Sequence, residues 1–281
     1  MRLVVNDYTF RVKLLKRAIR ILATGNLLAF IRNVLRQKSG KQSRLLPRPL
    51  DAHRGVAGVI NQILDVLPQR DNYLEVGIFE GATFQNIVAG EKWGVDIAPS
   101  FDYAELPKNS RVFVEPSDDF FAGLAVDKKF DMVYIDAEHT FHQAYRELVH
   151  SINHLEKWGV VLLDDTVPQD PIAAIPNETE SKEAAMRIHG TTVWSHQGDV
   201  WKLIFQVRNK HKNLTVRTIL HPSRPRTIMW INNPFESKMA LEETENLMAL
   251  TYEDVFSSGI PNEFGVRELG EILSEIRSRK L

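Results

Sequence analysis

The chain has 281 residues, of which 43% are hydrophobic and 25% are charged, a composition typical of a soluble globular protein. It contains no cysteine, which excludes disulfides and thiolate metal sites. No apolar run approaches the roughly 20 residues that a membrane-spanning helix needs. Basic residues interrupt the apolar runs near the N-terminus, which argues against a signal peptide. We therefore expect a cytoplasmic protein with one large domain and appendages.

The net charge of −1 conceals an uneven distribution of charge along the chain. Residues 1–50 contain twelve Lys or Arg and a single acid, Asp7, so the remaining chain is acidic. Within residues 8–37, apolar side chains recur at helical spacing between the basic ones, which predicts two amphipathic helices. This pattern fits an arm packed on the acidic body or in a homo-oligomer, and it also fits contact with a membrane surface. The acidic body disfavours nucleic acid as a partner.

The predicted elements alternate along the chain after a linker at 38–49. A helix is expected at 56–67, and later helices at 81–88 and 141–155. Strands are expected at 73–76, 92–97, 111–114, 132–135, 160–163, 214–220 and 227–231, the last two as a hairpin-like pair. Gly159 is expected to end a helix in the left-handed conformation. The fold class is therefore α/β, with a seven-stranded, mostly parallel sheet and helices on both of its faces.

The connection at 166–198 is unusually long, and we interpret it as a lid over the end of the fifth strand. Asp199, which follows it, is a residue type favoured at a helix N-cap. Residues 234–281 are expected to add further helices. Three segments result: a basic amphipathic helical arm and linker at 1–50, a main domain at 51–233 and a C-terminal helical extension at 234–281.

Acidic residues end two of the predicted strands. Asp136 follows the apolar run at 132–135, and Asp164 and Asp165 follow the run at 160–163. The carboxyl ends of neighbouring parallel strands converge on the crevice where ligands of open α/β sheets bind. Three carboxylates there would repel one another unless a cation joined them, and hard divalent cations prefer oxygen ligands. The sequence therefore predicts an enzyme with a metal at this edge of the sheet.

A glycine-containing turn follows the first predicted strand. Gly77 and Gly81 allow the backbone to turn sharply and to approach a ligand closely, just after the acid Glu75. The spacing Gly-x-x-x-Gly differs from the Gly-x-Gly-x-x-Gly of dinucleotide-binding enzymes. Asp96 ends the next strand, and a carboxylate there can accept hydrogen bonds from both hydroxyls of a ribose.

The stretch from Glu75 to Thr83 resembles motif I of class I methyltransferases, which bind S-adenosylmethionine (SAM). The resemblance implies a Rossmann-like fold in which residues 51–233 are the methyltransferase domain. It also implies that the glycine loop passes under the methionine part of SAM, that Asp96 binds the ribose and that Ser117 lies near the adenine. The cofactor-binding set that it implies is Glu75, Gly77, Gly81, Thr83, Asp96, Ser117 and Asp136.

The acidic cluster resembles a narrower family, the metal-dependent sugar O-methyltransferases of macrolide biosynthesis, of the mycinamicin and macrocin type. Their pattern is an aspartate, a histidine three residues later, and an adjacent acidic pair that closes the next strand. Here these are Asp136, His139, Asp164 and Asp165. The family often has Glu-Asp as the pair, so the shorter Asp164 would change the reach toward a metal. The resemblance covers residues 55–230 and is tight only at the motifs.

The resemblance implies a SAM-dependent O-methyltransferase acting on a hydroxyl of a sugar or other polyhydroxylated small molecule, such as a glycoside. It implies Mg²⁺ or Mn²⁺ held by Asp136, Asp164 and Asp165, and a catalytic pair of His139 and Asp136. A bound cation would lower the pKa of the acceptor hydroxyl, and His139 would take the proton as general base. Two alternatives stay open. One is a SAM methyltransferase for a catechol-like phenol or, without metal, for nitrogen; the other is a membrane-associated binding protein with a SAM-type fold.

Overall fold

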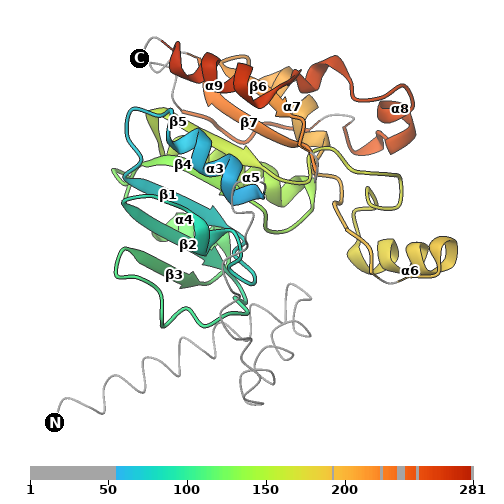
Figure 1. Ribbon diagram of the computed structural model, residues 1–281. Coiled ribbons are helices and arrows are strands. Elements are labelled where there is room, and N and C mark those ends of the chain that lie inside the picture. Colours follow the sequence, from blue (N-terminus) through green and yellow to red (C-terminus); the bar gives the residue numbers. More distant parts are fainter. Residues whose placement is uncertain (1–54, 192, 222–223, 233–237, 245–246, 280–281) are drawn as a thin grey trace.

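The computed structural model describes residues 55–191, 193–221, 224–232, 238–244 and 247–279, and the predicted basic arm at 8–37 lies outside them. One twisted sheet forms the centre of this part of the molecule, with helices on both sides (Figure 1). Its strands are β1 (Asn72–Val76), β2 (Glu91–Asp96), β3 (Ser110–Val114), β4 (Phe130–Ile135), β5 (Leu155–Leu163), β6 (Leu214–Ile219), β7 (Arg226–Ile231) and β8 (Val266–Arg267). The α-helices are α3 (Val56–Leu64), α4 (Ser117–Gly123), α5 (Phe141–Asn153), α6 (Glu178–His189), α7 (Lys202–Lys210), α8 (Tyr252–Phe256) and α9 (Leu269–Arg277).

The order of strands in the sheet is β3-β2-β1-β4-β5-β7-β6-β8. The order reverses between β1 and β4, because β2 and β3 lie on one side of β1 whereas β4 and β5 lie on the other. Such a reversal leaves a crevice beyond the carboxyl ends of the strands. β7 runs antiparallel to both of its neighbours, β5 and β6. The amino end of β7 therefore lies at the same edge of the sheet as the carboxyl end of β5.

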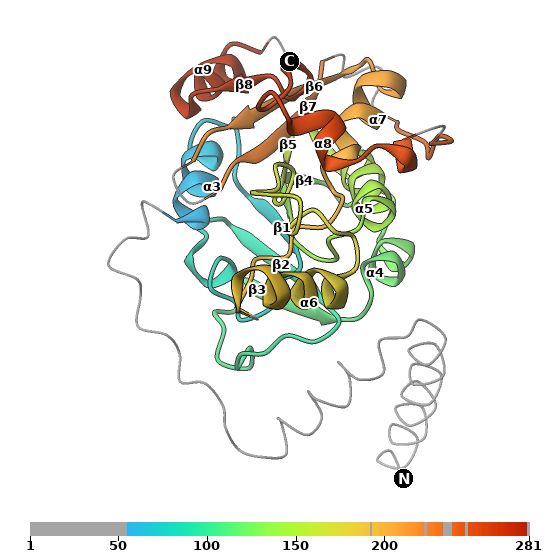
Figure 2. The ribbon, with the colours of Figure 1, turned by 90° about the vertical axis from the view of Figure 1, so that its right-hand side faces the viewer.

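Each face of the sheet has its own hydrophobic core, because side chains of a strand alternate between the two faces. In β4, Val133 and Ile135 belong to one core, and Met132 and Tyr134 belong to the other. The first core includes apolar side chains of α4, α5 and α7, and the second includes those of α3 and α9. Figure 2 shows these two groups of helices on opposite sides of the sheet. Burial on both faces explains why the central strands are continuous apolar runs.

The seven strands expected from the sequence are present, and β6 and β7 form the predicted antiparallel pair. The sheet has an eighth strand, however, because the two residues of β8 pair parallel with β6. The expected count of seven was therefore wrong, and residues 234–281 contribute an edge strand as well as helices. A two-residue strand is too short to show the alternation by which strands are recognised in a sequence.

The predictions for residues 81–88 and for Gly159 are wrong. Residues 81–88 form no α-helix but only a 3-10 turn, Phe84–Asn86. The Nζ of Lys92 donates to the carbonyl oxygens of Phe84 and Gln85 at 3.1 and 3.4 Å. In a longer helix these carbonyl oxygens would accept from backbone amides instead. Gly159 does not end a helix; it lies inside β5, where an added Cβ would lie 3.0 Å from the carbonyl oxygen of Phe130.

The connection at 166–198 contains the helix α6, capped by the side chain of Asn177 and ended by a left-handed Gly190. α6 lies beyond the carboxyl ends of β1 and β2, apart from the two cores (Figure 1). The sequence predicts that Asp199 caps the helix that follows it, but in the structure it does not. Its Oδ1 instead accepts from the backbone amide of Phe141 at 2.7 Å, at the start of α5.

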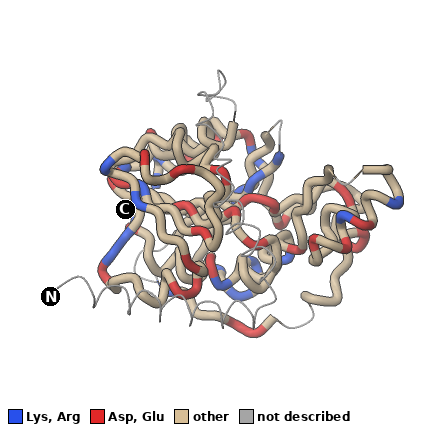
Figure 3. Tube along the Cα trace, turned by 90° about the horizontal axis from the view of Figure 1, so that it is seen from below, with Lys and Arg blue, Asp and Glu red and all other residues tan. Residues whose placement is uncertain are grey.

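Charged residues of both signs are interspersed along the described chain (Figure 3), in contrast with the excess of Lys and Arg in residues 1–50. Within the described residues, no helix is long and apolar enough to cross a membrane. The division into three segments at 50 and 233 stays a prediction.

Candidate active site

The site lies at the carboxyl edge of β1, β4 and β5. The backbone amide of Asp136 donates to Val76 at 2.8 Å, and that of Asp164 donates to Ile135 at 3.0 Å. These bonds continue the parallel ladder one residue past the strand ends. The acids that follow β4 and β5 are therefore held side by side, as the sequence predicted.

Asp136, His139 and Asp165 form a compact cluster. The Nε2 of His139 lies 3.4 Å from Oδ1 of Asp136 and 3.0 Å from Oδ2 of Asp165. One ligand atom from each residue lies within 4.8 Å of the other two, a spacing that could hold a metal ion. The Asp165 side chain is only 1% exposed. Its Oδ2 is buried without a hydrogen-bond partner of acceptable geometry, which makes it a hard oxygen donor suited to a divalent cation.

Asp164, the third acid of the predicted metal set, points elsewhere. Its Oδ2 accepts from the hydroxyl of Tyr134 at 2.7 Å and pairs with the guanidinium of Arg226 at 3.1 Å. Its Oδ1 accepts from the backbone amide of Asp165 at 2.9 Å. The Asp165 backbone has a φ of 57°, which is uncommon outside glycine, and this conformation turns its carboxylate toward His139. No motif in the sequence pointed to Arg226, which lies 62 residues after Asp164.

The charges in the cluster shift its pKa values. Burial opposes a charge on His139, but its hydrogen bond with Asp136 and the charges of Asp165 and Asp136 outweigh burial and raise its pKa to about 9. Burial would raise the pKa of Asp136, yet His139 holds it below its ordinary value. Burial, with repulsion by Asp164 and Asp136, raises the pKa of Asp165 to about 6 despite His139. In the absence of a metal, His139 is therefore the cation of this cluster.

The end of the 166–198 segment contacts His139. The ring Nδ1 of His139 lies 2.9 Å from the carbonyl oxygen of His196, and the two imidazoles stack with centroids 5.6 Å apart. Gly198 is left-handed, with φ of 62°, and an added Cβ would lie 1.6 Å from the carbonyl oxygen of His139. Only glycine fits there. We had not identified His196 or Gly198 as site residues.

The predicted glycine loop packs against the end of β4. Gly77 has a φ of 89°, and a Cβ on it would lie 2.0 Å from the carbonyl oxygen of Asp136. Gly81 is also left-handed, with a φ of 72°. Asp96 ties this loop to β2, because its Oδ2 accepts from the amide of Phe79 at 2.8 Å and its Oδ1 from that of Ala98 at 2.6 Å. The loop and Asp96 thus form one unit next to the acidic cluster.

The remaining predicted cofactor residues differ in burial. Glu75 is buried and accepts from the hydroxyl of Tyr73 at 2.7 Å, and burial raises its pKa to about 8. Thr83 precedes the 3-10 turn and makes no side-chain cap. Ser117 is buried at the start of α4, where its hydroxyl donates to Glu147 at 2.6 Å. Ser117 therefore belongs to the contact between α4 and α5.

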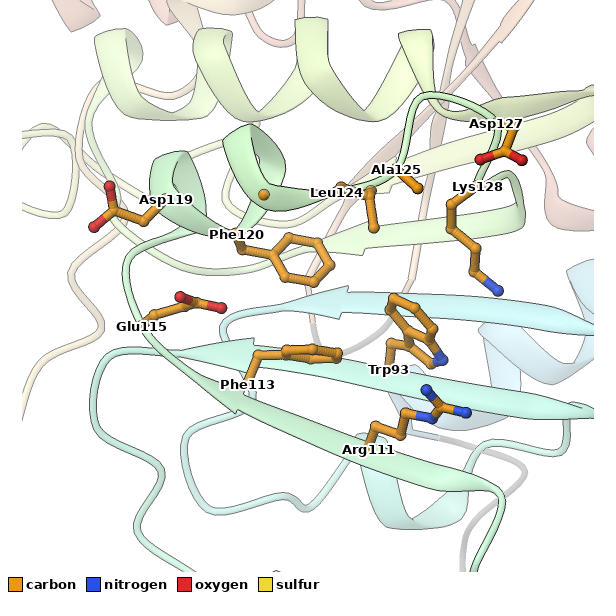
Figure 4. Close-up of a pocket in the computed structure, with 11 residues that line it drawn as sticks. Trp93, Arg111, Phe113, Glu115, Asp119, Phe120, Leu124, Ala125, Asp127 and Lys128 are labelled. Carbon is orange, nitrogen blue, oxygen red and sulfur yellow. The ribbon is translucent and has the colours of Figure 1, made fainter. Parts of the chain in front are cut away.

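A separate hollow of about 570 Å³ lies over β2 and β3, beside α4 (Figure 4). Trp93, Phe113 and Phe120 form its aromatic wall, and the Nζ of Lys128 lies 4.4 Å from the centroid of a Trp93 ring. None of its lining residues belongs to the predicted cofactor or metal sets.

Residues 24–166 match a family described as "Methyltransferase domain". Similar solved structures include the O-methyltransferase TomG from Streptomyces achromogenes in complex with SAM (14% identity, TM-score 0.45, covering 71% of this chain and 95% of that chain). Others are an O-methyltransferase from Bacillus cereus in complex with SAH (12%, 0.44, 70% and 87%) and a cofactor-bound protein, Rv0187, from MTB (15%, 0.45, 76% and 96%). No curated protein matches the chain.

Proposed function

Because this chain belongs to the methyltransferase-domain family, and is therefore a methyltransferase, we propose that SAM is its methyl donor. We propose further that it methylates a hydroxyl of a sugar or other polyhydroxylated small molecule, with Mg²⁺ or Mn²⁺ bound at the site. The observation that carries this proposal is the cluster of Asp136, His139 and Asp165 beside the glycine loop.

The glycine loop supports SAM as the donor. Gly77 and Gly81 adopt left-handed conformations that let the loop turn tightly against the end of β4, and SAM would lie on this loop beside the acidic cluster. Asp96 would exchange a backbone hydrogen bond for the ribose hydroxyls, since both of its oxygens accept from amides in this structure. Ser117 would lie toward the adenine, with Glu75 and Thr83 around the loop.

The carboxylates of Asp136 and Asp165 are the direct cation ligands in this proposal. A bound cation would lower the pKa of the acceptor hydroxyl and hold its oxygen in place. Asp164, the third acid of the predicted set, is paired with Arg226 and holds the backbone of Asp165. Its part is therefore to position Asp165, and Arg226 neutralises its charge.

With a cation bound to Asp136 and Asp165, the charges that raise the pKa of His139 would be neutralised, and the neutral ring could accept the proton of the acceptor hydroxyl. Its Nδ1 faces the carbonyl oxygen of His196, so in the neutral ring Nδ1 carries the hydrogen and Nε2 is the free base. As the hydroxyl gives its proton to Nε2, its oxygen forms a bond to the methyl carbon of SAM. The carbon–sulfur bond breaks and leaves SAH. The chain supplies mainly the alignment of the two reactants.

Two measurements test this function. Calorimetry should show SAM binding to the folded protein, and methyl transfer to a panel of sugars should stop in excess chelator and return with Mg²⁺ or Mn²⁺. Asp165→Asn should lower Mn²⁺ affinity by at least about 10–100-fold, whereas the exposed Asp127→Asn serves as the matched control. Folded protein that binds no SAM, or full transfer in chelator, would contradict the proposal.

A further inference from the structure

Arg224 is an arginine at the site that the proposed reaction does not use. Its guanidinium donates to Oδ1 of Asp165 and, at 2.6 Å, to the hydroxyl of Ser195 in the segment at 166–198. It comes just before β7, whose amino end lies at the carboxyl edge of β5. Arg224 thus joins the acidic cluster to the 166–198 segment.

Arg224 and Arg226 are two residues apart but have different environments. Arg226 is 5% exposed and is paired with a carboxylate, Asp164, that is equally buried. Arg224 is 31% exposed, while its partner Asp165 is 1% exposed. Arg226 therefore forms an internal ion pair, whereas about a third of the Arg224 side chain remains exposed beside the buried Asp165.

A divalent cation would make the charge of the site more positive. The site contains two guanidiniums and three carboxylates: Arg224, Arg226, Asp136, Asp164 and Asp165. Without His139, their charges sum to one negative charge. A divalent cation at Asp136 and Asp165 turns this into one positive charge. It also satisfies Asp165, which then no longer needs Arg224 as its counter-ion. A neutral acceptor would leave this excess positive charge in a partly buried site unbalanced.

We propose that Arg224 binds an acidic group of the methyl acceptor, so that the acceptor is a polyhydroxylated molecule carrying a carboxylate or a phosphate. This inference rests on the proposed function. A guanidinium presents donors in a planar fork that matches the two oxygens of either anion. The hydroxyl of Ser195, in the 166–198 segment, accepts from the same guanidinium and orients it. Arg224 is then the residue that selects among hydroxyl acceptors.

The test compares sugars that differ in one acidic group. Protein loaded with SAH and Mg²⁺ is melted in glucose, in glucuronate and in glucose 6-phosphate at equal concentration. At least one acidic sugar should raise the melting temperature by on the order of 3 °C more than glucose does; which acid does so tells carboxylate from phosphate. Arg224→Gln should remove this difference, and Arg224→Lys should retain part of it. Arg217→Gln, which breaks an ion pair with Glu275 on α9, is the matched control and should keep it.

Three results would overturn the inference: equal shifts with glucose and the acids, no shift with any of the sugars, or an acid preference that survives in Arg224→Gln. Calorimetry of SAM and Mn²⁺ on the same preparations separates this inference from the proposed function. Loss of acid preference with intact SAM and Mn²⁺ binding concerns Arg224 alone. Absence of SAM or Mn²⁺ binding in the unaltered protein contradicts the proposed function.

Discussion

At the scale of single residues, the adjacent acids Asp164 and Asp165 have different tasks. Asp164 is satisfied by Tyr134 and Arg226, whereas Oδ2 of Asp165 is buried beside His139 without a hydrogen bond of good geometry. The left-handed backbone of Asp165 separates the directions of the two side chains. Neighbouring carboxylates at a strand end therefore need not share a ligand.

His139→Ala should reduce methyl transfer by on the order of 10²–10⁴-fold, because the acceptor hydroxyl loses its general base. SAM affinity should change little, since the ring of His139 contacts Asp136, Asp165 and His196 but no residue of the glycine loop. Single-turnover rates and calorimetry measure the two effects separately. An unchanged rate would assign His139 to structure instead.

Gly77→Ala should destabilise the fold and abolish SAM binding. The left-handed conformation alone costs a non-glycine residue about 1–2 kcal/mol, and the added Cβ would also lie 2.0 Å from a backbone oxygen of Asp136. Gly259→Ala is the control, because Gly259 has a φ of 99° with nothing within 4 Å of an added Cβ. Chemical denaturation should show a larger loss of stability for Gly77→Ala; equal losses would mean that the close approach has no consequence.

At the scale of elements, the contact between α4 and α5 contains a buried carboxyl group, Glu147. Burial raises its pKa from 4.5 to about 7, although hydrogen bonds from Ser117 and Gln143 oppose the shift. Because the folded state holds this proton more tightly than the unfolded chain, the group stabilises the fold below pH ~4.5. That contribution is lost as the pH rises through about 7.

Glu147→Gln should therefore flatten the dependence of stability on pH between about 4.5 and 7. At pH 8 the variant should be more stable than the unaltered protein, by on the order of 1–3 kcal/mol. Glu180→Gln, at an exposed position of α6, is the control. Urea unfolding at several pH values measures the difference; parallel profiles for Glu147→Gln and the unaltered protein would refute this account of the contact.

The junction between the 166–198 segment and α7 depends on Gly198. Gly198→Ala should push the end of that segment away from His139 and lower methyl transfer at least about tenfold, because small displacements at a catalytic group have large effects on rate. SAM binding should persist. Gly190→Ala is the matched control, since Gly190 is also left-handed but an added Cβ there meets nothing within 4 Å. Equal rates in the two variants would contradict the role of this junction.

At the scale of the whole molecule, the described body has a complete sheet and a core on each face without residues 1–54. Removal of residues 1–50 should therefore leave SAM binding intact. It should change the oligomeric state or the solubility, because the two short amphipathic helices that the sequence predicts at 8–37 could not bury their apolar faces alone. Light scattering and calorimetry on the full and shortened chains measure both. Loss of SAM binding on shortening would show that the arm is part of the site.

The membrane alternative for the arm has its own measurement. Binding to anionic vesicles would gain ~1 kcal/mol per basic residue near the surface and would weaken strongly with salt. Salt-sensitive co-sedimentation of the full chain, but not of the shortened one, would contradict packing on protein. Absence of co-sedimentation for both would contradict the membrane alternative.

The sequence by itself determined the α/β class and the seven main strands, and it predicted that Asp136, His139, Asp164 and Asp165 lie at one edge of the sheet. These follow from local causes: apolar runs mark doubly buried strands, and an acid just after such a run lies at the carboxyl edge of the sheet. The structure brings Asp136, His139 and Asp165 together and pairs Asp164 with Arg226. The glycine loop was also predictable from local sequence, because Gly77 and Gly81 both adopt left-handed conformations that favour glycine.

Only the tertiary structure decided which cations balance the acids and which distant segment contacts them. Arg224 and Arg226 reach Asp165 and Asp164 because β7 runs antiparallel to β5, which brings the start of one strand to the end of the other. Gly198 meets His139 across 59 residues for a similar reason. Such contacts depend on the order and direction of strands and on the return path of a long segment. No periodicity or spacing within the chain encodes them, so they become visible only in the folded molecule.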